Sequence, residues 1–374
     1  MEEIQGKKFR KFSIREFGGS LGDWGTLIPF MIGYISIVGL NPAGMFLCLG
    51  ITNIVLGIRY NLPLPVQPQK TIGTVALANN WTPTLVISTG FGTGIVWTVL
   101  GFSKKLNAIV KKVPIISVRG IQLGLAFILG WASILLLLDN LILGFIAIGI
   151  ILLLMKSKHV PSAIILMFLG IFLVFINGQV SLSNLIFNIP RIDFYIPDFI
   201  NLVIGMVLAG FAQLFLTLTN VMIATVALIR DLFPESKVDA NSLSFNMGLI
   251  NLVNPFFGGI PLCHGSGGLA AQYAFGARTG GSMILEGLME IIFGLFFSQS
   301  ILMLFTNFPQ AILGAMLFYT AILLGKVSFK DFNKKKFPII LISAIFCFMF
   351  NVLIGFLIGI LLLIIYNKIV NDKE

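Results

Sequence analysis

Charged side chains are scarce in this chain. They account for 11% of its 374 residues, whereas hydrophobic residues account for 57%. Soluble domains usually carry about 25% charged residues. Apolar stretches of about 20 residues, each long enough to cross a hydrocarbon core of about 30 Å, recur from Thr26 to Tyr366. The composition therefore excludes an ordinary soluble protein and predicts an all-α polytopic membrane protein.

Cysteine and histidine are also rare, with three and two residues respectively. Cys48, Cys263 and Cys347 all lie within apolar stretches and none belongs to a CxxC pair, so neither a disulfide framework nor a metal site is indicated. The sequence shows no nucleophile with a matching base and no cluster of metal ligands. We therefore expect no enzymatic activity, no cofactor and no bound metal.

Acidic residues are outnumbered by basic ones, 15 to 25, which gives a net charge of +10. The basic residues do not form a patch of the kind that binds nucleic acid. They lie in short clusters between apolar stretches, as the positive-inside rule describes for cytoplasmic loops. The linker 178–198 holds only Arg191, while Lys70 and Arg119 fall within or at the edge of apolar stretches. This asymmetry predicts a multi-pass protein of the plasma membrane with both termini in the cytoplasm.

Charge clusters and turns rich in proline, glycine or asparagine divide the chain into about fourteen apolar segments. The last two are separated only by Asn351, and we leave open whether they are half-length helices or one long hairpin. The segments are 22–38, 42–58, 64–79, 83–102, 114–136, 140–155, 160–177, 199–228, 240–256, 260–277, 281–300, 307–325, 337–351 and 353–367.

An internal repeat is visible between the fifth and twelfth segments. The stretch from Pro114 to Gly130 resembles the one from Pro309 to Gly325, and each ends sixteen residues after its proline. The repeat unit therefore has seven segments, and because seven is odd the second copy must be inverted. Inverted repeats place the substrate between discontinuous helices near the midplane. The predicted divisions of the single transmembrane domain 1–374 are a first repeat 1–177, an extracytoplasmic linker 178–198 and a second repeat 199–374.

The third and tenth segments, equivalent under this repeat, are both interrupted. The third contains Pro63, Pro65 and Pro68, which cannot all lie in a regular helix because each removes a backbone donor. We predict an extended stretch to Pro68 and a helix from about Gln69. The tenth reads GGIPLCHGSGGLA, which predicts another short extended stretch and a helix from about Gly265 or Ser266.

Non-helical backbone at membrane depth survives only where it is buried in protein or lines a cavity, so both breaks indicate a site. Each helix N-terminus carries about half a positive charge and free N–H groups that bind anions. Together with Lys70 they give a local charge of about +2. A tetrahedral dianion such as molybdate or sulfate would balance it.

Lys70 is the strongest candidate, because a lysine near the membrane centre costs about 2.5–3.5 kcal/mol. The alternatives are that it snorkels to a face or pairs with Asp23. Gln67 and Gln69 are either oxyanion donors or structural amides. His264 is a packed histidine, a ligand or a proton carrier, and all three interpretations stay open.

Polar residues elsewhere face the bundle interior and are candidates of lower rank. Asp23 and Thr26 begin the first segment, and Thr217 and Asn220 lie in its repeat partner, the eighth. Interhelical hydrogen bonding explains them as well as substrate binding does. Glu286 and Glu290 lie one turn apart and could carry coupling protons, although we favour packing against a gate or a lysine. The predicted substrate-binding set is Gln67, Gln69, Lys70, His264, Gly265, Ser266, Asp23, Thr26, Thr217 and Asn220.

Three stretches resemble the molybdate-transporter family, which is related to the SulP sulfate permeases but lacks their STAS domain. They are GGSLGDWGTLIPF (18–30), LPLPVQPQKTIGTVAL (62–77) and IPLCHGSGGLAAQYAFGARTG (260–280), and the region 213–251 is also similar. The resemblance implies an oxyanion permease with the seven-plus-seven architecture of SulP and uracil permeases. Gln69 and Ala274 depart from the family, which commonly has methionine and a basic residue there.

The leading hypothesis is a secondary transporter that imports molybdate or tungstate by alternating access. The alternatives are a sulfate permease and an uncoupled anion channel on the same fold. A nucleobase permease is disfavoured because the eighth and tenth segments hold no carboxylate. The coupling ion, H⁺ or Na⁺, and a homodimeric state are left open, and no nucleic-acid partner is expected.

Overall fold

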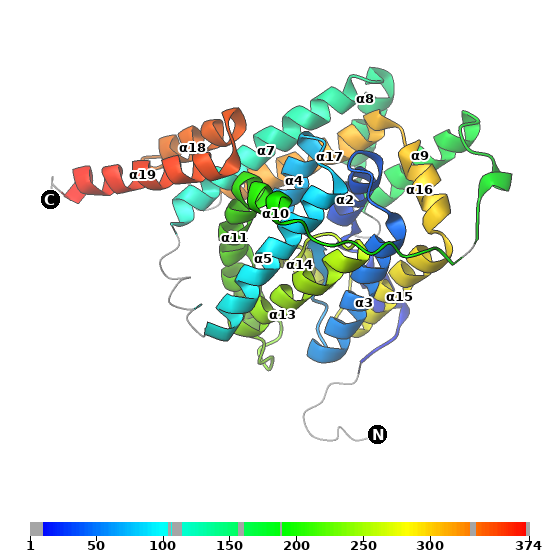
Figure 1. The fold of residues 1–374 in the computed structure, drawn as a ribbon, viewed down its shortest axis with the longest axis horizontal. Coiled ribbons are helices and arrows are strands. Elements are labelled where there is room, and N and C mark those ends of the chain that lie inside the picture. Colours follow the sequence, from blue (N-terminus) through cyan, green and yellow to red (C-terminus); the bar gives the residue numbers. More distant parts are fainter. Residues whose placement is uncertain are drawn as a thin grey trace.

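The computed structural model describes residues 10–103, 106, 114–155, 161–187, 189–329 and 334–371. The two ends of the chain and most of the basic clusters between 104 and 113, 156 and 160, and 330 and 333 lie outside the described residues. Almost all described secondary structure is helical (Figure 1).

The first half of the chain contains eight described helices and one short strand. They are α1 (Ile14–Ser20), α2 (Trp24–Ser36), α3 (Pro42–Tyr60), β1 (Val66–Pro68), α4 (Lys70–Ala78), α5 (Pro83–Ser103), α7 (Ile115–Leu137), α8 (Leu141–Leu154) and α9 (Ser162–Ile176).

The second half begins with one long helix in which α-helical and π-helical turns alternate. Its parts are α10 (Phe199–Gly205), a π-helical stretch (Met206–Gly210), α11 (Phe211–Thr217), a second π-helical stretch (Leu218–Thr225) and α12 (Val226–Leu232). The remaining elements are α13 (Ala240–Val253), β2 (Leu262–His264), α14 (Ser266–Ala274), α15 (Gly281–Phe296), α16 (Ser298–Thr306), α17 (Gln310–Ser328), α18 (Phe337–Met349) and α19 (Val352–Asn371), together with short 3₁₀ helices at Leu182–Asn184 and Asn254–Phe257.

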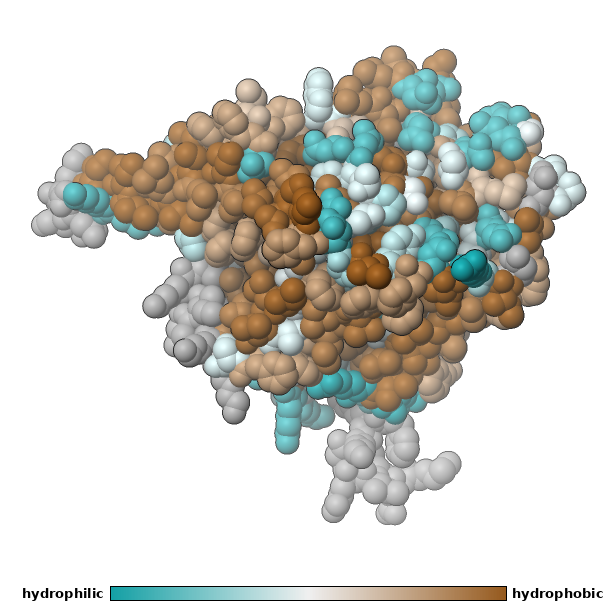
Figure 2. Space-filling view, viewed as in Figure 1, coloured by the Kyte–Doolittle hydropathy of each residue, from teal (hydrophilic) through white to brown (hydrophobic). Residues whose placement is uncertain are grey.

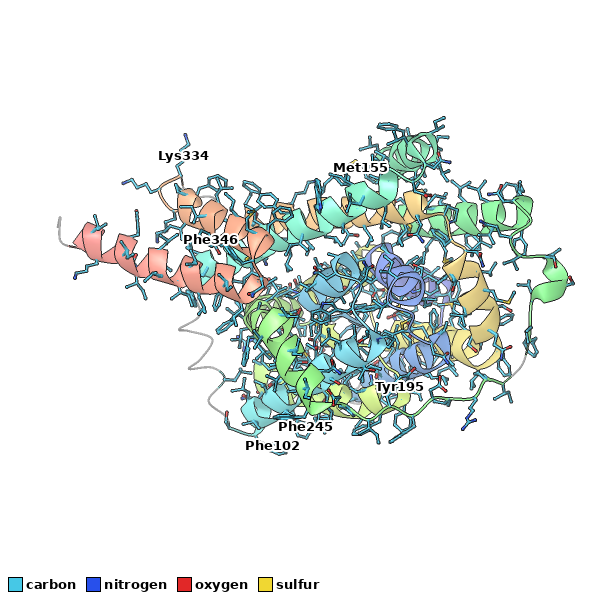
Figure 3. All side chains as sticks on the ribbon, turned by 45° about the horizontal axis from the view of Figure 1, so that its top comes forward. Phe102, Met155, Tyr195, Phe245, Lys334 and Phe346 are labelled. Carbon is cyan, nitrogen blue, oxygen red and sulfur yellow. The ribbon has the colours of Figure 1, made fainter. Side chains whose placement is uncertain are left out.

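The helices form two groups (Figure 1). In one group α7 packs along α17, and α8, α18 and α19 pack against this pair. In the other group α3 packs along α15, and α5 packs along α13. Figure 3 shows Phe102 and Phe245 together where α5 and α13 meet, with ring centroids 5.0 Å apart.

Glycine allows the closest of these helix contacts. A Cβ atom at Gly287 of α15 would lie 2.4 Å from the carbonyl oxygen of Gly50 in α3, and one at Gly94 of α5 would lie 2.7 Å from the backbone of Asn251 in α13. Small residues are typical of such interfaces in membranes, where dispersion contacts replace the hydrophobic drive between helices. In the α3/α15 and α5/α13 pairs the two backbones therefore touch, and any larger residue at these glycines would force the helices apart.

The outer surface is strongly apolar, which agrees with a multi-pass membrane protein. Figure 2 shows hydrophobic residues covering α18 and α19, and Leu361 and Ile364 of α19 are 53% and 60% exposed. Six described helices are long and apolar enough to cross a membrane, or seven if the bent pair α15 and α16 is one span. The count of fourteen segments stays a prediction.

The eleventh segment differs from its predicted bounds, 281–300. Helix α15 ends at Phe296, Phe297 leaves helical geometry with φ −119° and ψ 4°, and the chain bends by 85° into α16. The polar residues Ser298, Gln299 and Ser300 follow the bend, but they include neither a proline nor a charge, and the predicted segment ran through them. Helix α1 was not predicted either; the hydroxyl of Ser13 caps it by accepting from the Glu16 N–H.

The break predicted at Asn351 is confirmed. Helices α18 and α19 are two separate helices that pack against each other, and the Asn351 side chain accepts a hydrogen bond from the N–H of Ile354 at the start of α19. The hairpin alternative therefore describes this end of the chain, although α19 is a full-length helix.

Candidate functional site

The two predicted chain breaks meet in space. Strands β1 and β2 pair antiparallel, with Gln67 opposite Cys263 and Pro68 opposite Leu262. The Gln69 N–H extends the ladder by donating to the Pro261 carbonyl at 2.8 Å. The extended stretches predicted for the third and tenth segments are confirmed, and α4 and α14 begin directly after them at Lys70 and Ser266.

Neither of these helix N-termini is closed by its own capping side chain. Gln69 and Gly265 occupy the N-cap positions, and neither makes a side-chain capping bond. In α4 the N–H of Thr71 donates instead to the Gln213 side chain at 2.8 Å. In α14 the N–H of Gly268 turns back to the Gly265 carbonyl, and no hydrogen bond of the Ser266 or Gly267 N–H is recorded among the described residues.

Lys70 extends from the start of α4 across the first turn of α14. A Cβ atom at Gly267 would lie 4.0 Å from Lys70 Nζ. No carboxylate forms an ion pair with Lys70 among the residues described, and Asp23 instead accepts hydrogen bonds from Gln67 and Gln272. The alternative that Lys70 pairs with Asp23 is therefore wrong, because amide groups take up the carboxylate.

Asn220 lies beside the same turn. Its Oδ1 accepts a hydrogen bond from Ser266 Oγ at 2.9 Å, and its Nδ2 lies 3.6 Å from the Cβ position of Gly265. Asn220 belongs to the π-helical stretch Leu218–Thr225, and such stretches are rare and frequently occur at functional sites. The periodicity of the sequence gave no indication that the backbone hydrogen bonds here span five residues, as in a π-helix, instead of four.

We call the space bounded by Lys70, Asn220, Ser266 and Gly267 the polar seat. All four residues are at least partly accessible, whereas the paired strands behind them are buried. Three kinds of donor converge there, namely an ammonium group, a carboxamide and backbone N–H groups, while the Ser266 hydroxyl donates to Asn220 Oδ1. The described part of the seat contains no carboxylate.

Gln67 closes the inner side of the polar seat. Its Nε2 donates to Asp23 Oδ2 at 3.1 Å and to Thr26 Oγ1 at 3.0 Å. Its Oε1 lies 3.8 Å from the Cβ position of Gly265 and thus faces the seat. Asp23 is buried behind Gln67, whereas Thr26, which accepts from the same amide, is partly accessible.

Gln69 and Thr217 act within the scaffold. Gln69 is fully buried and donates to Thr93 Oγ1 and to the Leu262 carbonyl, both at 3.1 Å. Thr217 accepts from Gln213, the same side chain that binds the N–H of Thr71. These contacts favour the structural interpretation of both residues.

His264 also points away from the polar seat. Residues directly opposite in a ladder share a face, and successive residues alternate. Since Cys263 pairs with Gln67, His264 lies on the other face, where its ring packs against the backbone of Leu64 and Pro65. The side chain is fully buried, and this placement favours a packed histidine, although neither ring nitrogen makes the hydrogen bond expected of a packed, hydrogen-bonded histidine.

Three buried carboxylates lie behind Gln67. Asp23 and Glu286 both accept from Gln272 Nε2, at 3.2 and 2.6 Å, and Glu286 also accepts from Trp24 Nε1 at 3.2 Å. Glu290 accepts from Asn53 at 2.9 Å. We expected the two glutamates to pack against a gate or a lysine. The expectation of a lysine is wrong, because the groups that donate to Glu286 and Glu290 are all neutral.

A separate cavity of about 400 Å³ lies beside α2 and α15 and is lined mainly by aliphatic and aromatic residues, with Glu290 at its wall. Its apolar lining does not suit an inorganic anion. The cavity is therefore distinct from the polar seat.

Comparisons with known proteins agree on the family. The family model described as "Molybdate transporter of MFS superfamily" matches residues 15–129 and 205–324. Molybdate transporter 2 of Arabidopsis thaliana is 31% identical, with 86% of this chain and 80% of that protein covered. Molybdate transporter 1 of Chlamydomonas reinhardtii is 26% identical, with 92% and 89% covered.

Solved structures share the fold at low sequence identity. The transmembrane domain of the cyanobacterial bicarbonate transporter BicA matches with a TM-score of 0.64 and 15% identity over 96% of this chain and 100% of that one. SLC26A9 matches with a TM-score of 0.70 and 13% identity over 96% of this chain and 66% of that one. The resemblance carried by the sequence motifs is thus confirmed, and the relatives are transporters rather than enzymes.

Proposed function

Because this chain belongs to the molybdate-transporter family, we propose that it is a secondary transporter that carries molybdate, or its isostere tungstate, into the cell by alternating access. The observation that carries the proposal is the polar seat, where Lys70 and the first turn of α14 converge on one accessible space.

The seat matches a tetrahedral dianion in charge and in hydrogen bonding. The N-termini of α4 and α14 contribute about half a positive charge each, and the Lys70 ammonium group brings the total to about +2. Oxyanions accept hydrogen bonds on every oxygen, and the seat offers donors from Lys70, the Asn220 amide and the backbone of the first turn of α14, which includes the N–H of Ser266. Among the ten predicted residues, we propose Lys70, Asn220, Gly265 and Ser266 as direct contacts, with Gln67 behind them.

We also propose the inverted repeat of seven plus seven segments. The alignment of Pro114 with Pro309 shifts residue numbers by 195, and it pairs Gly130 with Gly325. A Cβ at Gly130 would lie 3.9 Å from Ala321, and one at Gly325 would lie 3.4 Å from Ala126. The shift converts each of these contacts into the other, as a two-fold relation between α7 and α17 requires.

Helix packing supports the same relation. Exchanging each segment with its counterpart seven places along the chain converts the α3/α15 pair into the α13/α5 pair, and both pairs are in close contact. The β1/β2 ladder is converted into itself. This symmetry supports repeats at 1–177 and 199–374 with the linker 178–198 between them.

For transport we propose that the bundle containing α4 and α14 moves against the bundle containing α7 and α17. The polar seat belongs to the first bundle, so its movement would expose the anion to one side and then to the other. The positive-inside pattern supports a plasma-membrane orientation with both termini in the cytoplasm and the linker 178–198 outside.

Uptake into proteoliposomes tests the function directly. Purified protein should accumulate labelled molybdate, and unlabelled tungstate should compete at similar concentrations. Stronger competition by sulfate than by tungstate would favour the sulfate permease, which shares the shape and charge of the substrate. Conductance far above the turnover of a carrier, without accumulation, would favour the anion channel. Absence of molybdate and sulfate flux would refute the proposed function.

A further inference from the structure

The three carboxylates behind Gln67 carry more negative charge than their surroundings neutralise. Asp23, Glu286 and Glu290 are 2%, 0% and 0% exposed. No lysine, arginine or histidine in the described part of the chain forms an ion pair with them, and their donors are two glutamines, an asparagine and a tryptophan. Buried charges persist only when they are paired, so this cluster must hold another positive species.

Glu290 gives independent support for that conclusion. Its Oε2 accepts from Asn53, but its Oε1 has no hydrogen-bond partner although the side chain is fully buried. An ionised oxygen left without a donor in such a place is strongly unfavourable. A proton removes the charge without needing room or further ligands, and the described residues contain no His, Cys, Asp and Glu group able to hold a metal ion.

The other titratable groups near the cluster have their own partners or lie across Gln67. Glu16 of α1 accepts from the backbone N–H groups of Arg278 and Thr279, and Lys70 lies on the far side of the Gln67 amide. Further titratable side chains on the elements packed around the cluster are Arg15, Tyr34, Cys48, Arg59, Tyr60, Cys263, His264, Tyr273, Tyr319 and Lys326.

Gln67 connects the cluster to the polar seat in a way that depends on protonation. Both hydrogens of its Nε2 are directed at Asp23 and Thr26, so its Oε1 must face the seat. A carbonyl oxygen at the edge of the seat repels an oxyanion. Gln272 Oε1 already accepts from Ser282 Oγ at 3.1 Å, whereas Gln67 Oε1 accepts from no described side chain.

A proton on Asp23 Oδ2 would reverse the orientation that Asp23 requires of the Gln67 amide. The carboxylic acid then donates, and the Thr26 hydroxyl turns its hydrogen from the Asp23 carbonyl towards Gln67. The Gln67 amide turns so that its Oε1 accepts from Asp23 Oδ2 and Thr26, and its Nε2 becomes a donor towards the oxyanion. Anion binding and protonation would thereby favour each other, and such coupling is reciprocal by thermodynamic necessity.

We propose that Asp23, with Glu286 as its partner through Gln272, binds a proton that is transported together with the oxyanion, and that rotation of the Gln67 amide couples the two. Glu290 holds a resident proton that does not exchange during transport. The proposal rests on the proposed oxyanion transport and adds the coupling ion.

The sign of the pH effect follows from this arrangement. The favourable contact between Gln67 and the anion is present when Asp23 is protonated and is lost as the pH rises. Molybdate affinity should therefore increase as the pH falls from 8 to 6, by at most about tenfold per pH unit for one linked proton.

The test uses the full chain in proteoliposomes containing a trapped pH-sensitive dye. Molybdate added outside should acidify the lumen, and equilibrium binding in detergent should show the pH dependence directly. Asp23→Asn and Glu286→Gln should each flatten the pH dependence, because both remove the titrating pair. Glu290→Gln is the matched control, one helical turn away and equally buried, and it should keep both the pH dependence and the proton flux.

Each contrary result has a distinct meaning. Molybdate flux in the wild type without proton movement, or flux that requires Na⁺ instead, would overturn the proton site and leave oxyanion transport intact. Loss of pH dependence in Glu290→Gln but not in Asp23→Asn or Glu286→Gln would also overturn the assignment. Absence of any molybdate flux or binding in the wild type would count against the proposed function itself. If Asp23→Asn does not fold, Glu286→Gln and the wild-type dye measurement decide the question.

Discussion

Replacing Lys70 with alanine tests the polar seat most directly. The Lys70 ammonium lies 4.0 Å from the Cβ position of Gly267, which places it within reach of an anion held by the first turn of α14. Two unit charges about 4 Å apart interact by about 4 kcal/mol at an effective dielectric constant of about 20. Removal of water from the ammonium offsets part of this energy.

A charge-assisted hydrogen bond contributes a net free energy of about 1.5–3 kcal/mol. Since 1.4 kcal/mol corresponds to about a factor of ten, the affinity of Lys70→Ala for molybdate should fall roughly ten- to hundredfold. Lys70→Arg should restore only part of the loss, because the planar guanidinium group needs a different arrangement of acceptors from a point-charge ammonium.

Binding can be measured by isothermal titration calorimetry of purified protein with molybdate and tungstate. Lys334→Ala is the matched control, because Lys334 is exposed and lies at the start of the α18 hairpin, away from the seat (Figure 3). Wild-type affinity in a folded Lys70→Ala protein would refute the placement of the anion between α4 and α14.

Three further predictions follow from the same structure. Ser266→Leu should reduce molybdate binding about as much as Lys70→Ala, because the larger side chain covers the first N–H groups of α14; calorimetry measures the loss. Gly287→Ala should lower thermal stability by about 1–3 kcal/mol through overpacking against Gly50, whereas Gly149→Ala, with no atom within 4 Å, should melt like the wild type. A cysteine at Ser181 should react with a membrane-impermeant maleimide added to intact cells, and one at Lys334 should react only after permeabilisation; labelling of both from outside would overturn the orientation.

The chain breaks could be predicted because their signals are local. Three prolines within six residues, 63–68, forbid a helix whatever surrounds them, and the helix must then begin at about Gln69. The same reasoning places the second helix near Gly265. Charge likewise identified Lys70, since an intramembrane lysine stands out in any apolar stretch. The two helix starts and Lys70 are therefore the parts of the site that lie where the sequence predicted them.

The remaining contacts could not be predicted because they depend on partners far apart in the sequence. Gln213 binds the N–H of Thr71, and Gln272 bridges Asp23 and Glu286. Neither glutamine stands in a sequence motif that would identify its partner. Gln69 has the same chemistry as Gln67 and by alternation lies on the same face of the ladder, and only its contacts with Thr93 and the Leu262 carbonyl, both distant in sequence, hold its amide away from the seat. The bend after Phe296 lacks a proline or a charge that would reveal it.

The arrangement of charge explains why a single amide separates the anion from the acidic cluster. The seat carries about +2 from Lys70 and two helix ends, and the three carboxylates would carry −3 if all were ionised. At the low dielectric constant of a membrane interior that negative charge would repel the anion and attract Lys70 towards Gln67. A partly protonated cluster removes the repulsion, whereas a wholly uncharged one would leave the positive seat uncompensated once the anion departs. Asp23, the carboxylate in contact with Gln67, is therefore the position at which loss of a proton would best accompany release of the anion.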